Sequence, residues 1–481
     1  MMACVLVRLP HFLSPDFFFD GDEATVGIMA QDILTGKSFP FYFYGQNYGF
    51  SLIEAISTAF FIGLFGSGIW ALKLGALLIF SVGLSFVWLA LKDLNVSKSL
   101  SIGIMTLLIT APTWFLWGAM PRGGYVTSFM CVCVLFYITQ SKELKPKWVI
   151  LAALFIGVAY VSQVLILLPI LAFIVVWLLS GEKVLKNIVV TIAVAGLVII
   201  GIQYIGKTQA VWGPPKLVLF KWSQWDNLLL QLKGLIPSYS NYFYYTMDIA
   251  MASWWKVLIW ISVLLLITSL VYNQFKQGGE NRLLTVVFTC CVLLSVFLIS
   301  TISLYSPRYW LGIITGFIFL FIFYVVKGGV LKMNRLIVFL LSGIFIVGAF
   351  ASVDMRRDWY YANVNEMHSL NALYKEVNRE QVKTVFVTDP LLQWKWNYLF
   401  GNEIPGTYFS EKERVGRYQT RVLKSYGSNP NKSALIGFYK IYPGFEKFKG
   451  FNDRPKMVAN KYFIAVDIED ELIDSVFVMC R

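Results

Sequence analysis

The residues whose types and spacing could do chemistry are concentrated in one polar, aromatic stretch, residues 17–50, which precedes the long apolar blocks of the chain. At its centre lies the acidic pair Asp22-Glu23. A carboxylate at the membrane surface can act as a general base on an acceptor hydroxyl or amine. Alternatively, the two acids cap a helix that starts near Ala24, because negative side chains favour a helix N-terminus. The residues alone leave both interpretations open.

Two arginines could bind a phosphate where predicted loops enter apolar segments. Arg308 lies in the sequence SPRYW and is followed by Tyr309. Arg122 lies in the sequence PRGGY and is followed by two glycines and Tyr125. A guanidinium can pair with phosphate oxygens through two parallel hydrogen bonds, and glycines allow a ligand to approach the backbone. Either arginine could instead be structural, as an anchor at the membrane interface or as part of a tight turn.

The composition is that of a membrane protein. The chain is 57% apolar and 17% aromatic, and only 14% of its residues are charged, whereas a soluble domain carries roughly 25% charged residues. We therefore expect a polytopic α-helical membrane protein. The net charge of +13 indicates topology signals and contacts with anionic membrane lipids rather than nucleic acid binding.

Cysteine and histidine usage does not indicate a metal site. Four of the six cysteines lie inside apolar runs, and the other two lie near the chain ends. His11 and His368 are the chain's two histidines, and no spacing resembles a zinc site. We assign no metal ligand.

The apolar blocks predict about ten spans, since a helix needs about 20 apolar residues to cross a bilayer. The run 148–180 is either one long tilted span or two spans, and lysines on both of its flanks favour a hairpin that turns at Ser162-Gln163. The predicted spans are 69–91, 100–118, 122–140, 148–162, 164–180, 187–205, 253–273, 283–301, 308–326 and 333–351.

Residues 1–68 are expected to form a truncated first span and a first outer loop with juxtamembrane helices. Residues 1–10 are too short to cross a membrane and look like the end of a span. Residues 24–36 predict a short helix. Residues 51–65, interrupted by Glu54, predict an amphipathic helix in the interface or a short span.

Two further segments are expected outside the membrane. The loop 206–252 is rich in Trp and Tyr, which predicts either an interfacial aromatic belt or a cover over a lipid-substrate cleft. Residues 352–481 have the composition of a soluble domain and predict a small α/β or α+β fold, with a helix and strands at 364–377, 383–388, 434–439 and 463–466.

The sequence resembles the GT-C type glycosyltransferases that use polyprenyl-phosphate sugars. Within this family it resembles the branch that includes bacterial relatives of protein O-mannosyltransferases and the aminoarabinose transferases. The stretch FFDGDEATVGIMAQDILTGKSFPFYFYGQNYGFSLIEA resembles the first outer loop of that family. PRGGY, SPRYWL and VTDPLLQWKWNYLF are weaker matches. The architecture matches over most of the chain, and the motifs cover about a tenth of it.

The resemblance implies an inverting transfer of a sugar from a polyprenyl monophosphate donor, on the outer face of a bacterial inner membrane. The loop carboxylate of the family maps onto Asp22 or Glu23, with Asp22 preferred. Some relatives bind a divalent metal through a Glu and a His, but the corresponding stretch here is Gly45-Gln46-Asn47-Tyr48. A divalent metal is therefore possible but not assigned, and the candidate donor contacts are Asp32, Gln46, Asn47 and Tyr48.

The function expected from the sequence is a membrane glycosyltransferase with a polyprenyl-phosphate-linked sugar as donor and a lipid, glycan or protein as acceptor. A lipid or solute transporter or flippase is the first alternative, and a non-catalytic membrane protein that binds partners through its outer domain is the second. An outer loop and an outer domain favour chemistry at the membrane surface over a transport site at mid-span.

The distribution of Lys and Arg predicts that residues 352–481 lie on the same side of the membrane as Asp22, opposite the lysines at 142–147. Lys145→Cys and Ser410→Cys should therefore react with a membrane-impermeant thiol reagent from opposite sides in oriented vesicles. Labelling of both positions from the same side would contradict the ten-span topology.

Overall fold

The computed structural model describes residues 1–13, 19–44, 49–207, 280–300, 307–327, 332–351, 366–387, 389–408, 433–438, 456–459 and 461–466, with a few isolated positions between 226 and 268. The chain forms two compact units. Unit 1 comprises Met1–Pro10, Pro40–Ser57 and Lys73–Met355, and unit 2 comprises His11–Phe39, Thr58–Leu72 and Arg356–Arg481. Residues 1–68, treated above as one segment, contribute to both units.

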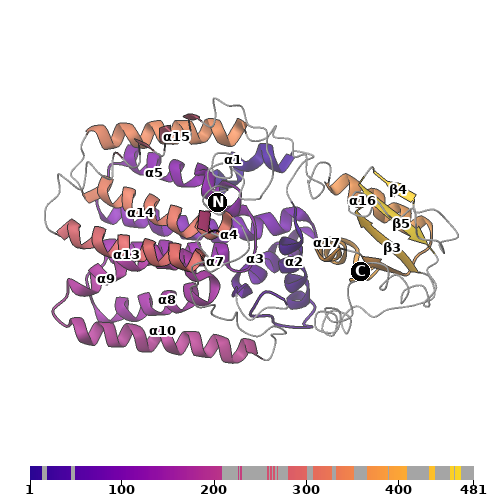
Figure 1. Cartoon of the computed structure of the whole chain (residues 1–481), viewed down its shortest axis with the longest axis horizontal. Coiled ribbons are helices and arrows are strands. Elements are labelled where there is room, and N and C mark those ends of the chain that lie inside the picture. The colour runs from indigo at the N-terminus through magenta and orange to yellow at the C-terminus, as the bar shows by residue number, and fades with distance from the viewer. Residues whose placement is uncertain are drawn as a thin grey trace. The chain divides into compact units, whose positions relative to one another are not determined.

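Unit 1 is helical. In Figure 1, α8 lies between α7 and α10, and α5 lies beside α15. Among the described residues, the helices that lie wholly or largely in this unit are α1 (Met2–Leu13), α4 (Ile69–Asp93), α5 (Lys98–Thr110), α6 (Pro112–Phe115), η1 (Trp117–Ala119), α7 (Tyr125–Ser141), α8 (Pro146–Leu167), η2 (Leu168–Ile170), α9 (Leu171–Leu179), α10 (Val184–Lys207), α13 (Glu280–Ser300), η4 (Pro307–Trp310), α14 (Leu311–Lys327) and α15 (Lys332–Ala351).

These helices confirm a polytopic membrane protein. Five helical segments among the described residues are long and apolar enough to cross a membrane: Ile69–Asp93, Pro146–Leu179, Val184–Gly206, Arg282–Ser300 and Arg308–Val326. Shorter apolar helices cover most of the other predicted spans. The predicted span 253–273 and the aromatic loop 206–252 lie almost entirely outside the described residues.

The predicted span 100–118 is a broken helix, because Pro112 cannot donate a backbone hydrogen bond. The break leaves helix carbonyls without N–H partners, and Arg8 of α1 supplies the donors. Its fully buried guanidinium donates to the carbonyl oxygens of Phe115 at 2.5 Å and of Ile109 and Trp114 at 3.2 Å each. Arg8 thus satisfies the backbone at the break and ties α1 to it.

The run 148–180 forms the predicted hairpin. Gln163 has φ −153° and ψ 94°, so the helix is interrupted one residue after Ser162. The indole N–H of Trp177 donates to the carbonyl oxygen of Lys142 at 3.0 Å. The end of α9 therefore lies beside the residues that precede α8. This arrangement requires the chain to reverse its direction near Gln163.

Unit 2 contains a small five-stranded sheet in the order β2-β1-β3-β5-β4. β1 pairs in parallel with β2 and β3, whereas β5 pairs antiparallel with β3 and β4. The predicted small α/β or α+β domain is confirmed. Its elements are α16 (Glu366–Arg379), β1 (Thr384–Val387), α17 (Pro390–Phe400), β2 (Gly406–Tyr408), β3 (Ser433–Phe438), β4 (Lys456–Val458) and β5 (Tyr462–Val466).

The helix of the acidic loop, α2 (Gly21–Leu34), starts three residues earlier than predicted and also belongs to unit 2. It begins with a capping box. The Asp20 side chain accepts from the backbone N–H of Glu23 at 2.9 Å, and the Glu23 carboxylate accepts from the backbone N–H of Asp20 at 3.2 Å. This reciprocal pair satisfies two of the unpaired donors at the helix start.

Helix α2 packs against α17, and Gly27 makes the close approach possible. A Cβ atom at Gly27 would lie 2.4 Å from the ring of Tyr398. Tyr398 is buried, and its hydroxyl both donates to the carbonyl oxygen of Gly68 at 2.8 Å and lies 3.1 Å from that residue's backbone N–H. Gln31 adds a hydrogen bond from its amide to the Tyr398 carbonyl oxygen at 3.0 Å. The C-terminal domain therefore fixes the helix that carries the acidic pair.

We predict that Gly27→Ala destabilises the protein by about 1–3 kcal/mol, because the added methyl overpacks against a ring that cannot move away. Gly63→Ala is the matched control, since the nearest atom to its Cβ would be 4.0 Å away on Leu34 and alanine favours the helix by up to about 1 kcal/mol. Thermal unfolding in one detergent, followed by tryptophan fluorescence, measures both. Equal melting temperatures for the two variants would refute this packing.

Candidate functional site

The acidic pair of α2 is divided between two structural environments. Glu23 is fully buried, and its carboxylate completes the capping box. Asp22 occupies the second helical position, is half-buried and lies outside the box, which is made by Asp20 and Glu23. The two acids therefore differ in burial and in their place at the helix start.

Asp32, the predicted donor contact on the same helix, is near the other end of α2. It is buried, and its carboxylate lies 3.6 Å from the ammonium group of Lys37. Its carbonyl oxygen accepts from the backbone N–H of Lys37 at 2.9 Å. The structure therefore places Asp22, Glu23 and Asp32 on one helix of unit 2, with Asp32 at the C-terminal turn.

The PRGGY segment of unit 1 gathers a cation and aromatic rings. The guanidinium of Arg122 lies 5.1 Å from the ring centroid of Trp117, which is a cation–π distance. The ring of Tyr125 lies 5.0 Å from the same indole. Arg122 and Tyr125, both predicted to bind substrate, are thus brought together, and both are buried.

The second glycine of PRGGY is required by the protein's own backbone. Gly124 has φ +84°, in the left-handed region that favours glycine, and it precedes α7 directly. A Cβ atom there would lie 2.7 Å from the carbonyl oxygen of Phe50 and 3.1 Å from the Cα of Ser162. The close approach that the sequence suggested for a ligand is made here by two other chain segments, so the tight-turn interpretation holds for this residue.

Glu54 is the residue of this region that the sequence analysis did not assign to the site. It lies in α3 (Leu52–Phe65), a fourteen-residue helix outside the span-length segments. Its fully buried carboxylate accepts hydrogen bonds from the backbone N–H groups of Gly124, Val126 and Thr127 at 3.2, 3.1 and 3.3 Å. Burial raises the pKa of Glu54 to about 7, against the opposing effect of these hydrogen bonds. An acid interrupting an apolar helix was the signal available in the sequence.

The hairpin break of α8 connects this turn to the second arginine. The Gln163 amide donates to the carbonyl oxygen of Gly123 at 2.7 Å. Two residues later, the carbonyl oxygen of Leu165 would lie 1.8 Å from a Cβ atom at Gly312, so the first turn of α14 lies directly on the break. Arg308 lies in η4, immediately before α14, with its guanidinium 5.4 Å from the ring centroid of Tyr309. Both residues are half-buried.

Unit 1 therefore contains a junction of irregular backbone, bordered by the PRGGY turn on one side and the segment of Arg308 and Tyr309 on the other. Such backbone is tolerated in a membrane protein where it is buried in protein or lines a polar cavity. Gln46, Asn47 and Tyr48, also predicted to contact the donor, lie outside the described residues. Among the residues that the structure does describe, no group of three or more His, Cys, Asp or Glu could hold a metal ion.

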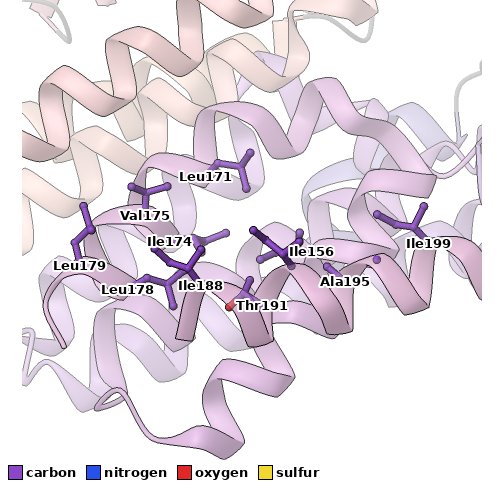
Figure 2. A pocket seen from close by; sticks show the side chains of 12 residues that line it. Ile156, Leu171, Ile174, Val175, Leu178, Leu179, Ile188, Thr191, Ala195 and Ile199 are labelled. Carbon is purple, nitrogen blue, oxygen red and sulfur yellow. The ribbon is translucent and has the colours of Figure 1, made fainter. Parts of the chain in front are cut away.

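A separate apolar cavity of about 480 Å³ lies between α8, α9 and α10 (Figure 2). Aliphatic side chains such as Ile156, Leu171 and Ile188 line it, and Thr191 contributes a hydroxyl. None of the described residues that line it has an ionisable side chain.

Two solved structures resemble the chain over nearly its whole length. One is ArnT from Cupriavidus metallidurans in the apo state, with a TM-score of 0.58, 12% identity and coverage of 97% of each chain. The other is ArnT from the same organism bound to undecaprenyl phosphate, with a TM-score of 0.52, 13% identity and coverage of 98% of each chain. The chain has an ArnT-like fold.

At this level of identity the similarity to ArnT establishes the fold alone, and it confirms the GT-C resemblance seen in the sequence. No protein-family model matches the sequence, and comparison with curated proteins gives no match. The functional reading of the ArnT-like fold therefore depends on the chemistry of the residues placed above.

Proposed function

We propose that this protein is an integral membrane glycosyltransferase that moves a sugar from a polyprenyl-phosphate donor to an acceptor on the extracytoplasmic face. The observation that carries the proposal is the position of Asp22 in a chain with an ArnT-like fold. Asp22 is half-buried in the first turn of α2, and its neighbours Asp20 and Glu23 form the capping box of that helix. The structure of ArnT with undecaprenyl phosphate supports a polyprenyl phosphate as the ligand class.

In the proposed reaction Asp22 is the general base. Its carboxylate takes the proton from the acceptor hydroxyl or amine, and the acceptor oxygen or nitrogen attacks the anomeric carbon of the donor sugar. The bond from that carbon to the phosphate oxygen breaks, and the polyprenyl phosphate leaves with the bonding electrons. A single displacement of this kind inverts the anomeric configuration.

Glu23 has a supporting role in this mechanism. Its carboxylate is committed to the capping box with Asp20, so it fixes the first turn of α2 and with it the backbone of Asp22. The packing of α2 against Tyr398 holds the rest of the helix. Preorganisation of this kind lowers the cost of placing the base at the acceptor.

Arg308 is proposed to bind the donor phosphate, and Arg122 is the second candidate. A guanidinium can offset the charge that develops on the leaving phosphate in the transition state. Arg308 is half-buried beside Tyr309, whereas Arg122 is buried against Trp117. The greater exposure of Arg308 makes it the better candidate for direct contact.

We predict that Asp22→Asn lowers turnover by about 10²–10⁴-fold, the usual contribution of general base catalysis, and leaves donor binding intact. The alternative, in which Asp22 only stabilises the start of the helix through its charge, predicts a small change, because a negative charge in the first turn contributes about 0.3–1 kcal/mol. Glu23→Gln should retain the capping box, which accepts Glu or Gln, and lose less activity. The assay follows the release of polyprenyl phosphate from a panel of polyprenyl-phosphate sugars in proteoliposomes that contain an envelope lipid extract.

Glu143→Gln is the control for loss of a carboxylate, because Glu143 is exposed and pairs with Lys145. Near-parental turnover in both Asp22→Asn and Glu23→Gln would show that the loop is structural and the mechanism wrong. Loss of turnover in Glu23→Gln alone would exchange the roles of the two acids. Solute uptake without release of polyprenyl phosphate would favour the transporter alternative.

A further inference from the structure

The start of α7 is capped by a side chain from a distant segment. A helix N-terminus has N–H groups without intrahelical acceptors and carries a partial positive charge. The residue before α7 is Gly124, which has no side chain to cap it, and the carboxylate of Glu54 accepts from Gly124, Val126 and Thr127 instead. Glu54 therefore occupies the place that an anionic ligand would take at such a helix end.

We propose that Glu54 is a positioning residue of the donor site, which fixes the PRGGY turn and thereby the place of Arg122. The inference rests on the proposed function, and it assigns a residue and a role that the reaction scheme above does not use. Glu54 acts on the donor indirectly, because its carboxylate is fully buried and its three hydrogen bonds go to backbone amides of the turn and the first turn of α7.

The same geometry determines where the donor phosphate goes. Since the N–H groups at the start of α7 are already bonded to a carboxylate, a second anion at that position would meet a like charge at close range. The phosphate is left to the guanidinium groups that border the junction. Gln163 supports the turn from the other side, through its hydrogen bond to the carbonyl oxygen of Gly123.

The pH dependence of donor affinity distinguishes a positioning role of Glu54 from a purely structural one. The raised pKa of about 7 means that the carboxylate is ionised above this pH and takes up a proton below it. The ionised form is the better acceptor for backbone N–H groups. Donor affinity should therefore be highest above pH 7 and fall as the pH decreases through 7.

The test measures binding of an undecaprenyl-phosphate hexose to the full-length protein in nanodiscs between pH 5.5 and 8.5. A phosphodiester is used because it keeps its single charge over this range, whereas a phosphate monoester has a second pKa of about 6. Glu54→Gln keeps the size of the side chain but replaces one acceptor oxygen with a donor. Glu54→Asp keeps the charge on a shorter side chain, and Ile56→Ala is an exposed control on the same helix.

We expect Glu54→Gln to bind the donor about tenfold more weakly at pH 8, which corresponds to about 1.4 kcal/mol, and to lose the pH dependence. Glu54→Asp should be intermediate and retain the pH dependence, and Ile56→Ala should match the parent. Hydrogen exchange of the peptide that covers residues 122–128 should be faster in Glu54→Gln, with or without the donor, because the amides lose their acceptor.

An unchanged affinity and pH profile in Glu54→Gln would overturn the positioning role, whatever the exchange data show. An unchanged exchange rate in that peptide would overturn the hydrogen-bonding role of the carboxylate. If the parent protein shows slow exchange at the start of α7 but binds no donor at any pH, the proposed function fails while the hydrogen bonding of Glu54 stands.

Discussion

The structure of unit 1 depends on the need to pair every backbone N–H and C=O group in an apolar environment, where each unpaired group costs several kcal/mol. Regular helices meet this need by themselves, but the described part of unit 1 is interrupted at Pro112, Gly124 and Gln163. Polar side chains are present at each interruption. Arg8 donates to the carbonyls at the first, Glu54 accepts from the amides at the second, and Gln163 itself bonds to the PRGGY turn.

The interruptions explain how a bundle of apolar helices can present polar chemistry. In the interior of an unbroken helix every backbone N–H and C=O group is already paired, so only side chains could bind a polar ligand there. Here the PRGGY turn, the hairpin break and the start of α14 meet in one place, with Gly312 packed directly on Leu165. Arg122 and Arg308 border this junction. In unit 2 the acidic helix α2 is held by a different means, the packing of Gly27 against a tyrosine that is itself bonded to Gly68.

Much of the fold was predictable from the sequence, because local patterns determine it. The long apolar runs predicted the span-length helices of the described residues, and the lysines around 148–180 predicted its hairpin. Short apolar segments near the C-terminus predicted β1, β3 and β5. The start of α2 was misplaced by three residues, since the capping box of Asp20 and Glu23 was overlooked. The role of Glu54 was not predictable in this way. Its hydrogen-bond partners lie about 70 residues away, and only the folded chain brings them together.

The candidate site was predictable in part. Asp22 and Arg308 were selected by residue type and position, and the structure shows that both are half-buried. Arg122 was selected by the same argument, but a hydropathy pattern does not show its packing against the indole of Trp117. A pattern of apolar residues reports which segments are buried. It does not report which polar groups satisfy the backbone where those segments are interrupted.

The central claim is that this protein recognises the phosphate of a polyprenyl lipid through an arginine at the junction. The most direct measurement is native mass spectrometry of the purified protein with undecaprenyl phosphate and with undecaprenol, which has the same hydrocarbon chain without the phosphate. We expect undecaprenyl phosphate to bind and undecaprenol not to displace it. Arg308→Ala should weaken binding by about 10–100-fold, the value of a hydrogen bond to a charged group, and Arg308→Lys should restore it in part. Equal binding of the two lipids, unchanged in Arg308→Ala, would contradict the account.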